Sequence, residues 1–117
     1  MGGFTQSQKK KIMERDGYLC VPHAGTCHGG LVVHHRANRG MGGRKSADTL
    51  SNGLTVCSDW NTRVEADSAL AEQARGYGWK IPTSWPPDQE SIYYPLLGKN
   101  FYLDDGGGMS ETDDVPF

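Results

Sequence analysis

The sequence lacks any long apolar segment. One of its longest uninterrupted apolar runs is Leu31–Val33, which is far too short to cross a bilayer. The start, Met1-Gly2-Gly3-Phe4, carries no secretory signal, and Gln6 stands where a myristoylation signal requires Ser or Thr. We therefore expect an intracellular protein rather than a membrane or secreted one.

Cysteine is also scarce. The three cysteines, Cys20, Cys27 and Cys57, cannot all pair within one chain, and in a reducing cytosol thiols or metal ligands are expected rather than disulfides. The chain has 117 residues, of which 36% are apolar and 16 are glycine, so it can build one modest core. A domain of this size often needs a metal, a disulfide or a partner for stability.

Basic residues are missing from the last fourteen positions. Residues 104–117 hold five of the 14 acidic residues, whereas all 12 lysines and arginines lie in residues 1–103 beside nine acids. The net charge of −2 thus divides into +3 for residues 1–103 and −5 for the tail, so it does not exclude nucleic acid as a partner. We expect a single domain over residues 1–103 and a disordered, glycine-rich acidic tail over residues 104–117.

Local patterns predict the elements of the first half. Thr5 and Gln8 have the spacing of a capping box, which predicts a helix over residues 5–16 that Gly17 ends in the left-handed conformation. Residues 31–34 and 54–57 are short, apolar and rich in β-branched side chains, so both are expected to be strands. Residues 36–53 between them contain glycine, basic and turn-forming residues without apolar periodicity, and loops of this length are usually functional.

The second half is expected to contain one helix and one hairpin. Ser58 or Asp59 can cap a helix that runs to about Arg75, with apolar residues such as Val64 and Ala74 facing inward. Residues 92–94 and 101–103 are predicted to be two short strands that turn at 98–100.

Chemistry-bearing residues concentrate between positions 31 and 67. His34 and His35 end the first expected strand, where one ring can bind a metal while the other faces a substrate, although a lone His near a strand is usually only structural. Four basic residues follow before the first acid, Asp48: they are Arg36, Arg39, Arg44 and Lys45. A neutral imidazole is an effective base near neutral pH, and basic side chains hold a phosphate backbone without reading its sequence. These parts are the ones that phosphodiester hydrolysis needs.

The order of these residues resembles a known motif. His34-His35, then Asn52, then Asn61 and Glu65 four residues later, is similar to the motif of the HNH endonucleases, with Asn61 in place of the last histidine. The segments HHRANRGMGGRK, SNGLTVC and NTRVEAD resemble in particular the small HNH endonucleases encoded by tailed bacteriophages. The resemblance implies an α+β protein with a ββα-metal core at about residues 18–75, to which an N-terminal helix and a short C-terminal β-hairpin are added.

The resemblance also implies roles for single residues. His35 would be the general base, Asn52 would tie the loop together and orient that base, and His34 and Asn61 would bind the catalytic metal. Glu65 would bind the metal through water, or would only pair with an arginine. Oxygen ligands and few imidazoles favour Mg²⁺ or Mn²⁺ at this position.

One departure concerns a structural zinc. Many relatives hold zinc with two Cys-x-x-Cys pairs, whereas the corresponding positions here are Cys20 with His23 and Cys57 with Trp60. Trp60 cannot bind zinc, so either the site is rebuilt or Trp60 fills the space with apolar packing. A rebuilt site would use Cys20, His23, Cys57 and the extra Cys27. No role is predicted for His28.

We therefore expect a metal-dependent DNA endonuclease that leaves 5′-phosphate and 3′-hydroxyl ends. The resemblance implies a phage-encoded protein of the bacterial host cytoplasm that acts as a monomer or weak dimer beside the large subunit of a packaging terminase. Two alternatives remain open: a catalytically inactive DNA-binding or packaging-accessory module, and a small zinc-binding adaptor in which the histidines are ligands.

Overall fold

The computed structural model describes residues 3–23, 29–38 and 47–116. In these ranges the helices are α1 (Gln6–Arg15), α2 (Ser58–Ala66) and α3 (Ser68–Gly76), and single 3₁₀ turns are η2 (Leu50–Asn52) and η3 (Pro87–Gln89). The strands are β1 (Leu31–His35), β2 (Gly53–Cys57), β3 (Ile92–Tyr94), β4 (Lys99–Leu103) and β5 (Met109–Thr112), and they form two small antiparallel sheets. The chain is therefore an α+β protein, as predicted, and none of the described helices combines the length and apolar character that a membrane span requires.

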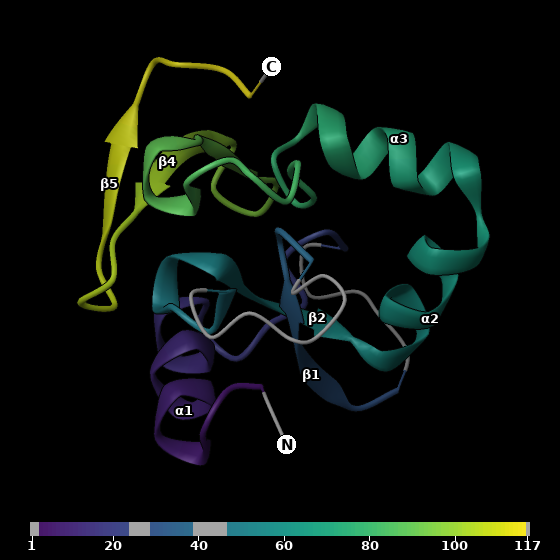
Figure 1. Cartoon of the computed structure of the whole chain (residues 1–117), viewed down its shortest axis with the longest axis horizontal. Helices are drawn as coiled ribbons and strands as arrows, with labels where there is room; N and C mark the ends of the chain where they lie inside the picture. The colour runs from purple at the N-terminus through teal and green to yellow at the C-terminus, as the bar shows by residue number, and fades with distance from the viewer. Residues whose placement is uncertain (1–2, 24–28, 39–46, 117) are drawn as a thin grey trace.

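The β1–β2 pair separates helix α1 from helix α2 (Figure 1). The strands are antiparallel, with His34 opposite Leu54 and His35 opposite Gly53. Successive side chains of a strand point to opposite faces, so the two histidines face different helices. The ring of His34 meets Trp60 of α2, whereas the ring of His35 stacks on Phe4, directly before α1.

Helix α1 begins and ends as predicted. Thr5 and Gln8 form a complete capping box, and Gly17 follows the helix with a φ of +72°. The helix packs closely on the sheet at Gly53, where an added Cβ would lie 2.2 Å from Cδ1 of Ile12. Phe4, Ile12 and Leu50 form a small apolar cluster that holds this face of the sheet.

The end of α1 is joined to both sheets through the buried carboxylate of Asp16. Its oxygens accept hydrogen bonds from the side chain of Arg15, from the backbone amide of Thr55 in β2 and from the hydroxyl of Tyr94 in β3. Burial and the neighbouring Asp16 charge raise the pKa of Tyr94, so its hydroxyl keeps its proton and remains a donor.

The predicted helix over residues 58–75 is two helices. Asp67 adopts an extended conformation, with φ −112° and ψ 109°, and its carboxylate accepts the backbone amides of Ala69 and Leu70. A short acidic side chain competes for backbone amides in this way, so Asp67 ends α2 and caps α3. The prediction of one continuous helix was wrong at this residue.

The second sheet contains one more strand than predicted. Strands β3 and β4 form the expected pair, and β5 adds to the other side of β4, with Met109 opposite Leu103. Residues 109–112 were expected to belong to a disordered tail, and that prediction was wrong. These residues are half-buried or exposed because β5 is an edge strand, so an apolar pattern does not mark them.

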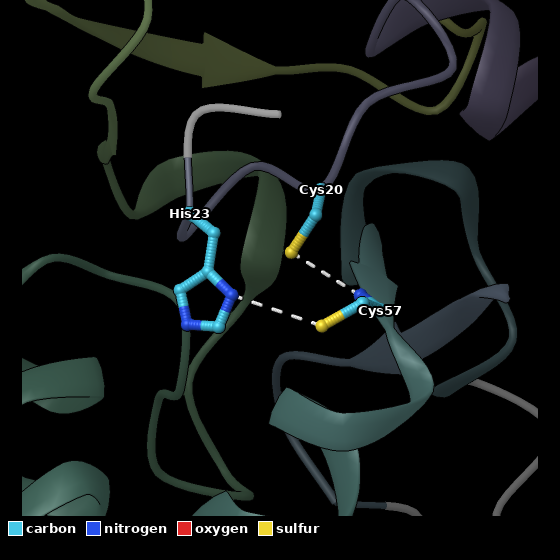
Figure 2. Close-up of side chains that lie close together, drawn as sticks. All are labelled: Cys20, His23 and Cys57. Atoms are coloured by element: carbon cyan, nitrogen blue, oxygen red, sulfur yellow. Dashed lines mark hydrogen bonds between the residues drawn. The ribbon is translucent and has the colours of Figure 1, made fainter. Parts of the chain in front are cut away.

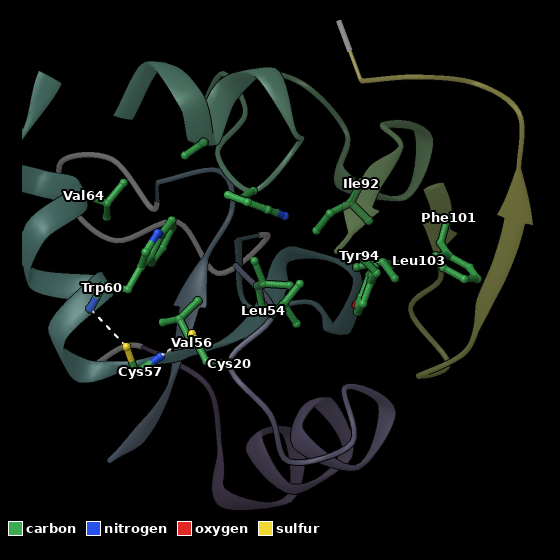
Figure 3. Packing of buried hydrophobic residues seen from close by; sticks show 13 residues of the cluster. Cys20, Leu54, Val56, Cys57, Trp60, Val64, Ile92, Tyr94, Phe101 and Leu103 are labelled. Atoms are coloured by element: carbon green, nitrogen blue, oxygen red, sulfur yellow. Dashed lines mark hydrogen bonds between the residues drawn. The ribbon is translucent and has the colours of Figure 1, made fainter. Parts of the chain in front are cut away.

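One apolar core connects the two sheets (Figure 3). Val56 from β2, Trp60 and Val64 from α2, and Ile92 and Leu103 from the second sheet all belong to it and are 0–1% exposed. Burying side chains of this size contributes about 1.5–3 kcal/mol each before entropy is counted. The β1–β2 pair is therefore fixed against the C-terminal half of the chain.

A buried arginine completes that attachment. Arg36 follows β1 and is 0% exposed, and its five N–H groups all donate to backbone carbonyl oxygens. The acceptors belong to Gly78, Ser51, Pro87, Glu90 and Ser91, at 2.9–3.5 Å. Burial lowers the pKa of Arg36 to about 10, which still leaves it charged at neutral pH. Arg36 was predicted to hold the DNA backbone, but it has no donor left for a phosphate, so that prediction was wrong.

Replacing Arg36 with methionine should therefore destabilise the fold strongly. The change leaves five buried or part-buried carbonyl groups short of a donor, so we expect the free energy of unfolding to fall by about 3–5 kcal/mol. Urea unfolding followed by tryptophan fluorescence measures this change. The matched control is Arg75→Met, because Arg75 is exposed on α3. Equal stability of the two variants would contradict the structural role of Arg36.

Candidate active site and metal cluster

His34 lies between β1 and α2, at 5% exposure. Its Nε2 is 3.1 Å from the carbonyl oxygen of Trp79, and the side chain of Asn61 lies near enough to the ring to influence its pKa. Because a carbonyl oxygen only accepts, Nε2 carries the hydrogen and donates it. In the neutral ring Nδ1 then keeps its lone pair. The structure thus brings together the two residues that were predicted to share the catalytic metal.

The environment keeps the His34 ring uncharged. Burial, and next the positive charge of Lys80, lower the pKa of His34 to about 4, against an ordinary value near 6.5. The ring is therefore neutral at neutral pH, which is the form that binds metals. Metal-binding histidines also donate their second ring nitrogen to a carbonyl or carboxylate, as His34 does to Trp79.

Glu65 stands one turn after Asn61 on α2, and it forms an ion pair with a lysine. Its Oε1 lies 4.0 Å from Nζ of Lys80, and its side chain is 59% exposed. The sequence offered two roles for Glu65, a metal ligand through water and a partner of an arginine. Lys80 was not among the residues that the sequence singled out, and its charge lies close enough to affect His34 as well.

Asn52 joins Ala37 and Ala47, the described residues on either side of the basic segment (residues 39–46). It is 0% exposed, and its amide donates to the carbonyl oxygens of Ala37 and Ala47 at 2.9 and 2.8 Å. Its Oδ1 accepts the backbone amide of Ala37 at 2.8 Å, and its backbone carbonyl accepts that of Arg36. Ala37 and Ala47 lie on either side of the segment that contains Arg39, Arg44 and Lys45. These three predicted DNA-binding residues lie outside the described ranges.

His35 is the more accessible histidine of the pair. Its side chain is 20% exposed, its ring stacks on Phe4 with centroids 4.3 Å apart, and its Nε2 lies 2.7 Å from Oδ1 of Asp48. Asp48 was not predicted as a site residue. The signal that marks it is its position as the first acid after the run of basic residues.

Cys20, His23 and Cys57 form a separate cluster (Figure 2). Their possible ligand atoms all lie within 4.8 Å of one another, and Nδ1 of His23 is 3.7 Å from Sγ of Cys57. Two ligands of a tetrahedral zinc, one sulfur and one nitrogen, lie about 3.6 Å apart. The cluster can therefore hold a metal ion, as the rebuilt site predicted from the sequence required, while Cys27 and His28 lie outside the described residues.

Backbone amides donate hydrogen bonds to the sulfur atoms of Cys20 and Cys57. The amide of Cys57 donates to Sγ of Cys20 at 3.2 Å, and the amide of Trp60 donates to Sγ of Cys57 at 3.3 Å. Such donors stabilise a thiolate, which is the form that binds metal. The Trp60 side chain is fully buried in the core, so the packing that was the alternative to a metal site exists beside the cluster. The two interpretations are compatible.

If the cluster holds a metal, removing one ligand should release the metal and weaken the fold. We expect Cys20→Ser and His23→Ala to lose the bound metal and to lower Tm by at least about 10 °C, because binding energy at such a site is folding energy. Elemental analysis of the purified protein and thermal unfolding measure both effects. The matched control is His28→Ala, which should keep the metal. A wild-type protein that carries no metal, and whose Tm is unaffected by chelators, would contradict the assignment.

The chain matches no family model, no curated protein and no solved structure. The resemblance to HNH endonucleases therefore rests on the motif residues alone. The arrangement of these residues comprises a neutral His34 near Asn61, His35 on the opposite face with Asp48, and a Cys/His cluster that includes Cys57 at the start of α2.

Proposed function

We propose that this protein is a metal-dependent endonuclease that hydrolyses DNA phosphodiester bonds. The observation that carries the proposal is the position of the His34 ring against α2, where it meets Trp60 and lies near Asn61. His35 is next in the strand, and Asn52 joins the residues on either side of the basic segment. This order of strand, loop, strand and helix is the one that the resemblance to HNH endonucleases implies.

The donor atoms near His34 fit a divalent ion in two respects. The ring is held neutral, and the lone pair on its Nδ1 is left over by the bond of Nε2 to Trp79. Asn61 adds an amide oxygen and Glu65 a carboxylate in the next turn, and ligands of this kind suit Mg²⁺ or Mn²⁺ better than zinc. Such an ion would stabilise the negative charge on the scissile phosphate and on the leaving oxygen.

Lys80 is the feature that opposes a divalent ion at this place. Its ammonium pairs with Glu65 and adds to the positive potential at His34. For Glu65 to act as a ligand, Lys80 would have to release it. His34 and Asn61 are therefore the residues on which metal binding depends most. Glu65 contributes only when its ion pair with Lys80 breaks.

In the proposed reaction, His35 takes a proton from water, and the hydroxide attacks phosphorus in line with the 3′ oxygen. The products carry a 5′ phosphate and a 3′ hydroxyl. Arg39, Arg44 and Lys45 would hold the DNA backbone, and such contacts position the substrate without reading bases. The proposal also includes an association with a phage packaging terminase, which the resemblance alone suggests.

The Cys20–His23–Cys57 cluster supports a second, structural metal. Sulfur and imidazole ligands together are typical of zinc, and Cys27 is the candidate for a fourth ligand. The same cluster favours one alternative function, that of a small zinc-binding adaptor without nuclease activity. One bound zinc in a protein that never cleaves DNA would favour this alternative.

Replacing His35 with alanine should abolish DNA cleavage. Removal of a general base typically lowers a rate by about 10²–10⁴-fold. We expect this loss in a plasmid-nicking assay with Mg²⁺ or Mn²⁺, with the unfolding free energy and the affinity for DNA nearly unchanged. The control is Glu72→Ala, because Glu72 is exposed on α3. Cleavage by His35→Ala at the wild-type rate would show that the base is another group, and cleavage that survives EDTA would count against the metal.

A further inference from the structure

His35 and Asp48 share a hydrogen bond to which the proposed function assigns no role. Nε2 of His35 lies 2.7 Å from Oδ1 of Asp48, and both side chains are mostly buried, at 20% and 14% exposure. An ionised carboxylate only accepts hydrogen bonds, so Nε2 must carry the hydrogen. In the neutral ring the lone pair is then on Nδ1.

The other ring nitrogen is available. Across the described part of the chain, Nδ1 of His35 has no hydrogen-bond partner, and the ring as a whole retains a fifth of its exposure. Phe4 covers one face of the ring in a nearly parallel stack, with an interplanar angle of 18°. Asp48 and Phe4 together therefore limit rotation of the ring about its side-chain bonds.

Asp48 is itself fixed by the segment that opens α1. The backbone amide of Gly3 donates to Oδ2 of Asp48 at 3.2 Å, and Nε2 of Gln8 donates to its backbone carbonyl at 2.8 Å. Gln8 also accepts the amide of Thr5 in the capping box. The start of α1 thus holds the carboxylate, and the carboxylate holds the imidazole.

We infer that Asp48 is a positioning residue that sets the tautomer of His35 and makes Nδ1 the nitrogen that accepts the proton from water. The catalytic half of this inference rests on the proposed function, whereas the tautomer does not. As the O–H bond of water breaks, an N–H bond forms at Nδ1. The resulting hydroxide forms the new P–O bond while the bond to the 3′ oxygen breaks, and that oxygen takes a proton from solvent. The Asp48 carboxylate stabilises the imidazolium formed at His35.

The difference between the two histidines follows from their acceptors. His34 donates Nε2–H to a neutral carbonyl, and burial of the ring favours its uncharged form. His35 donates Nε2–H to the carboxylate of Asp48. The negative charge of this carboxylate stabilises the positive charge that the ring acquires when it accepts a proton. The same ring nitrogen is therefore used in two ways, once to fix the tautomer of a ligand and once to support a base.

Asp48→Asn gives a sharp test because of the Gly3 amide. That N–H needs an acceptor, so the new carboxamide should turn its oxygen toward Gly3 and its NH₂ toward His35. Nε2 would then have to accept, and the ring hydrogen would move to Nδ1. We expect wild-type protein to show Nε2–H at His35 in long-range ¹H–¹⁵N spectra, and Asp48→Asn to show Nδ1–H. Cleavage should fall at least about 100-fold in kcat, with KM nearly unchanged.

The matched control is Asp88→Asn, which makes the same chemical change at an exposed position. It should keep both the wild-type tautomer and the wild-type rate. Asp48→Ala, which removes the acceptor without adding a donor, should give a mixture of tautomers and an intermediate rate, and it serves if Asp48→Asn does not fold.

The outcomes separate this inference from the proposed function. A wild-type ring with its hydrogen on Nδ1, or an Asp48→Asn protein with unchanged tautomer and rate, would overturn the role of Asp48. An inverted tautomer together with a large loss of kcat supports it. If the tautomer inverts but the wild-type protein cleaves no DNA, the positioning role stands and the nuclease proposal, with the catalytic half of this inference, fails.

Discussion

The arrangement of this domain depends on one buried charge, the guanidinium of Arg36. Its hydrogen bonds reach carbonyl groups between α3 and β3 and directly before β2, so it holds the strand that carries His34 and His35 against the C-terminal half of the chain. A charged group at 0% exposure is tolerated only when its donors are satisfied. Gly78 is part of this constraint, because its φ of +77° and the backbone of Ser91, 2.2 Å from where its Cβ would lie, leave no room for a side chain.

With the strand fixed, the alternation of a β-strand assigns the two histidines to different environments. His34 faces α2, where burial keeps it neutral beside Asn61, and His35 faces α1, where Asp48 orients it. Helix α1 lies outside the expected ββα core, yet the residues before and at its start contact both His35 and Asp48. An added element thus contributes to the candidate active site.

Local signals in the sequence were sufficient where neighbours along the chain decide the structure. The capping box at Thr5 and Gln8 and the two apolar strands are of this kind. The break at Asp67 was also local, and its signal, an Asp followed by Ser within a helical pattern, was missed. The buried position of Arg36 was not predictable, because its acceptors come from segments up to 55 residues away. The local sequence around a buried arginine after a strand does not differ from that around an exposed one. Lys80 was missed for the same reason.

The central claim is that His34 and Asn61 share a divalent ion while the cysteines hold a different one. A crystal structure of the protein soaked in Mn²⁺, with anomalous difference maps recorded for manganese and zinc, tests this claim most directly. The account predicts a manganese peak within coordination distance of Nδ1 of His34 and of the Asn61 side chain, and a separate zinc peak among Cys20, His23 and Cys57. A map without manganese at His34, in which Lys80 still pairs with Glu65, would contradict it.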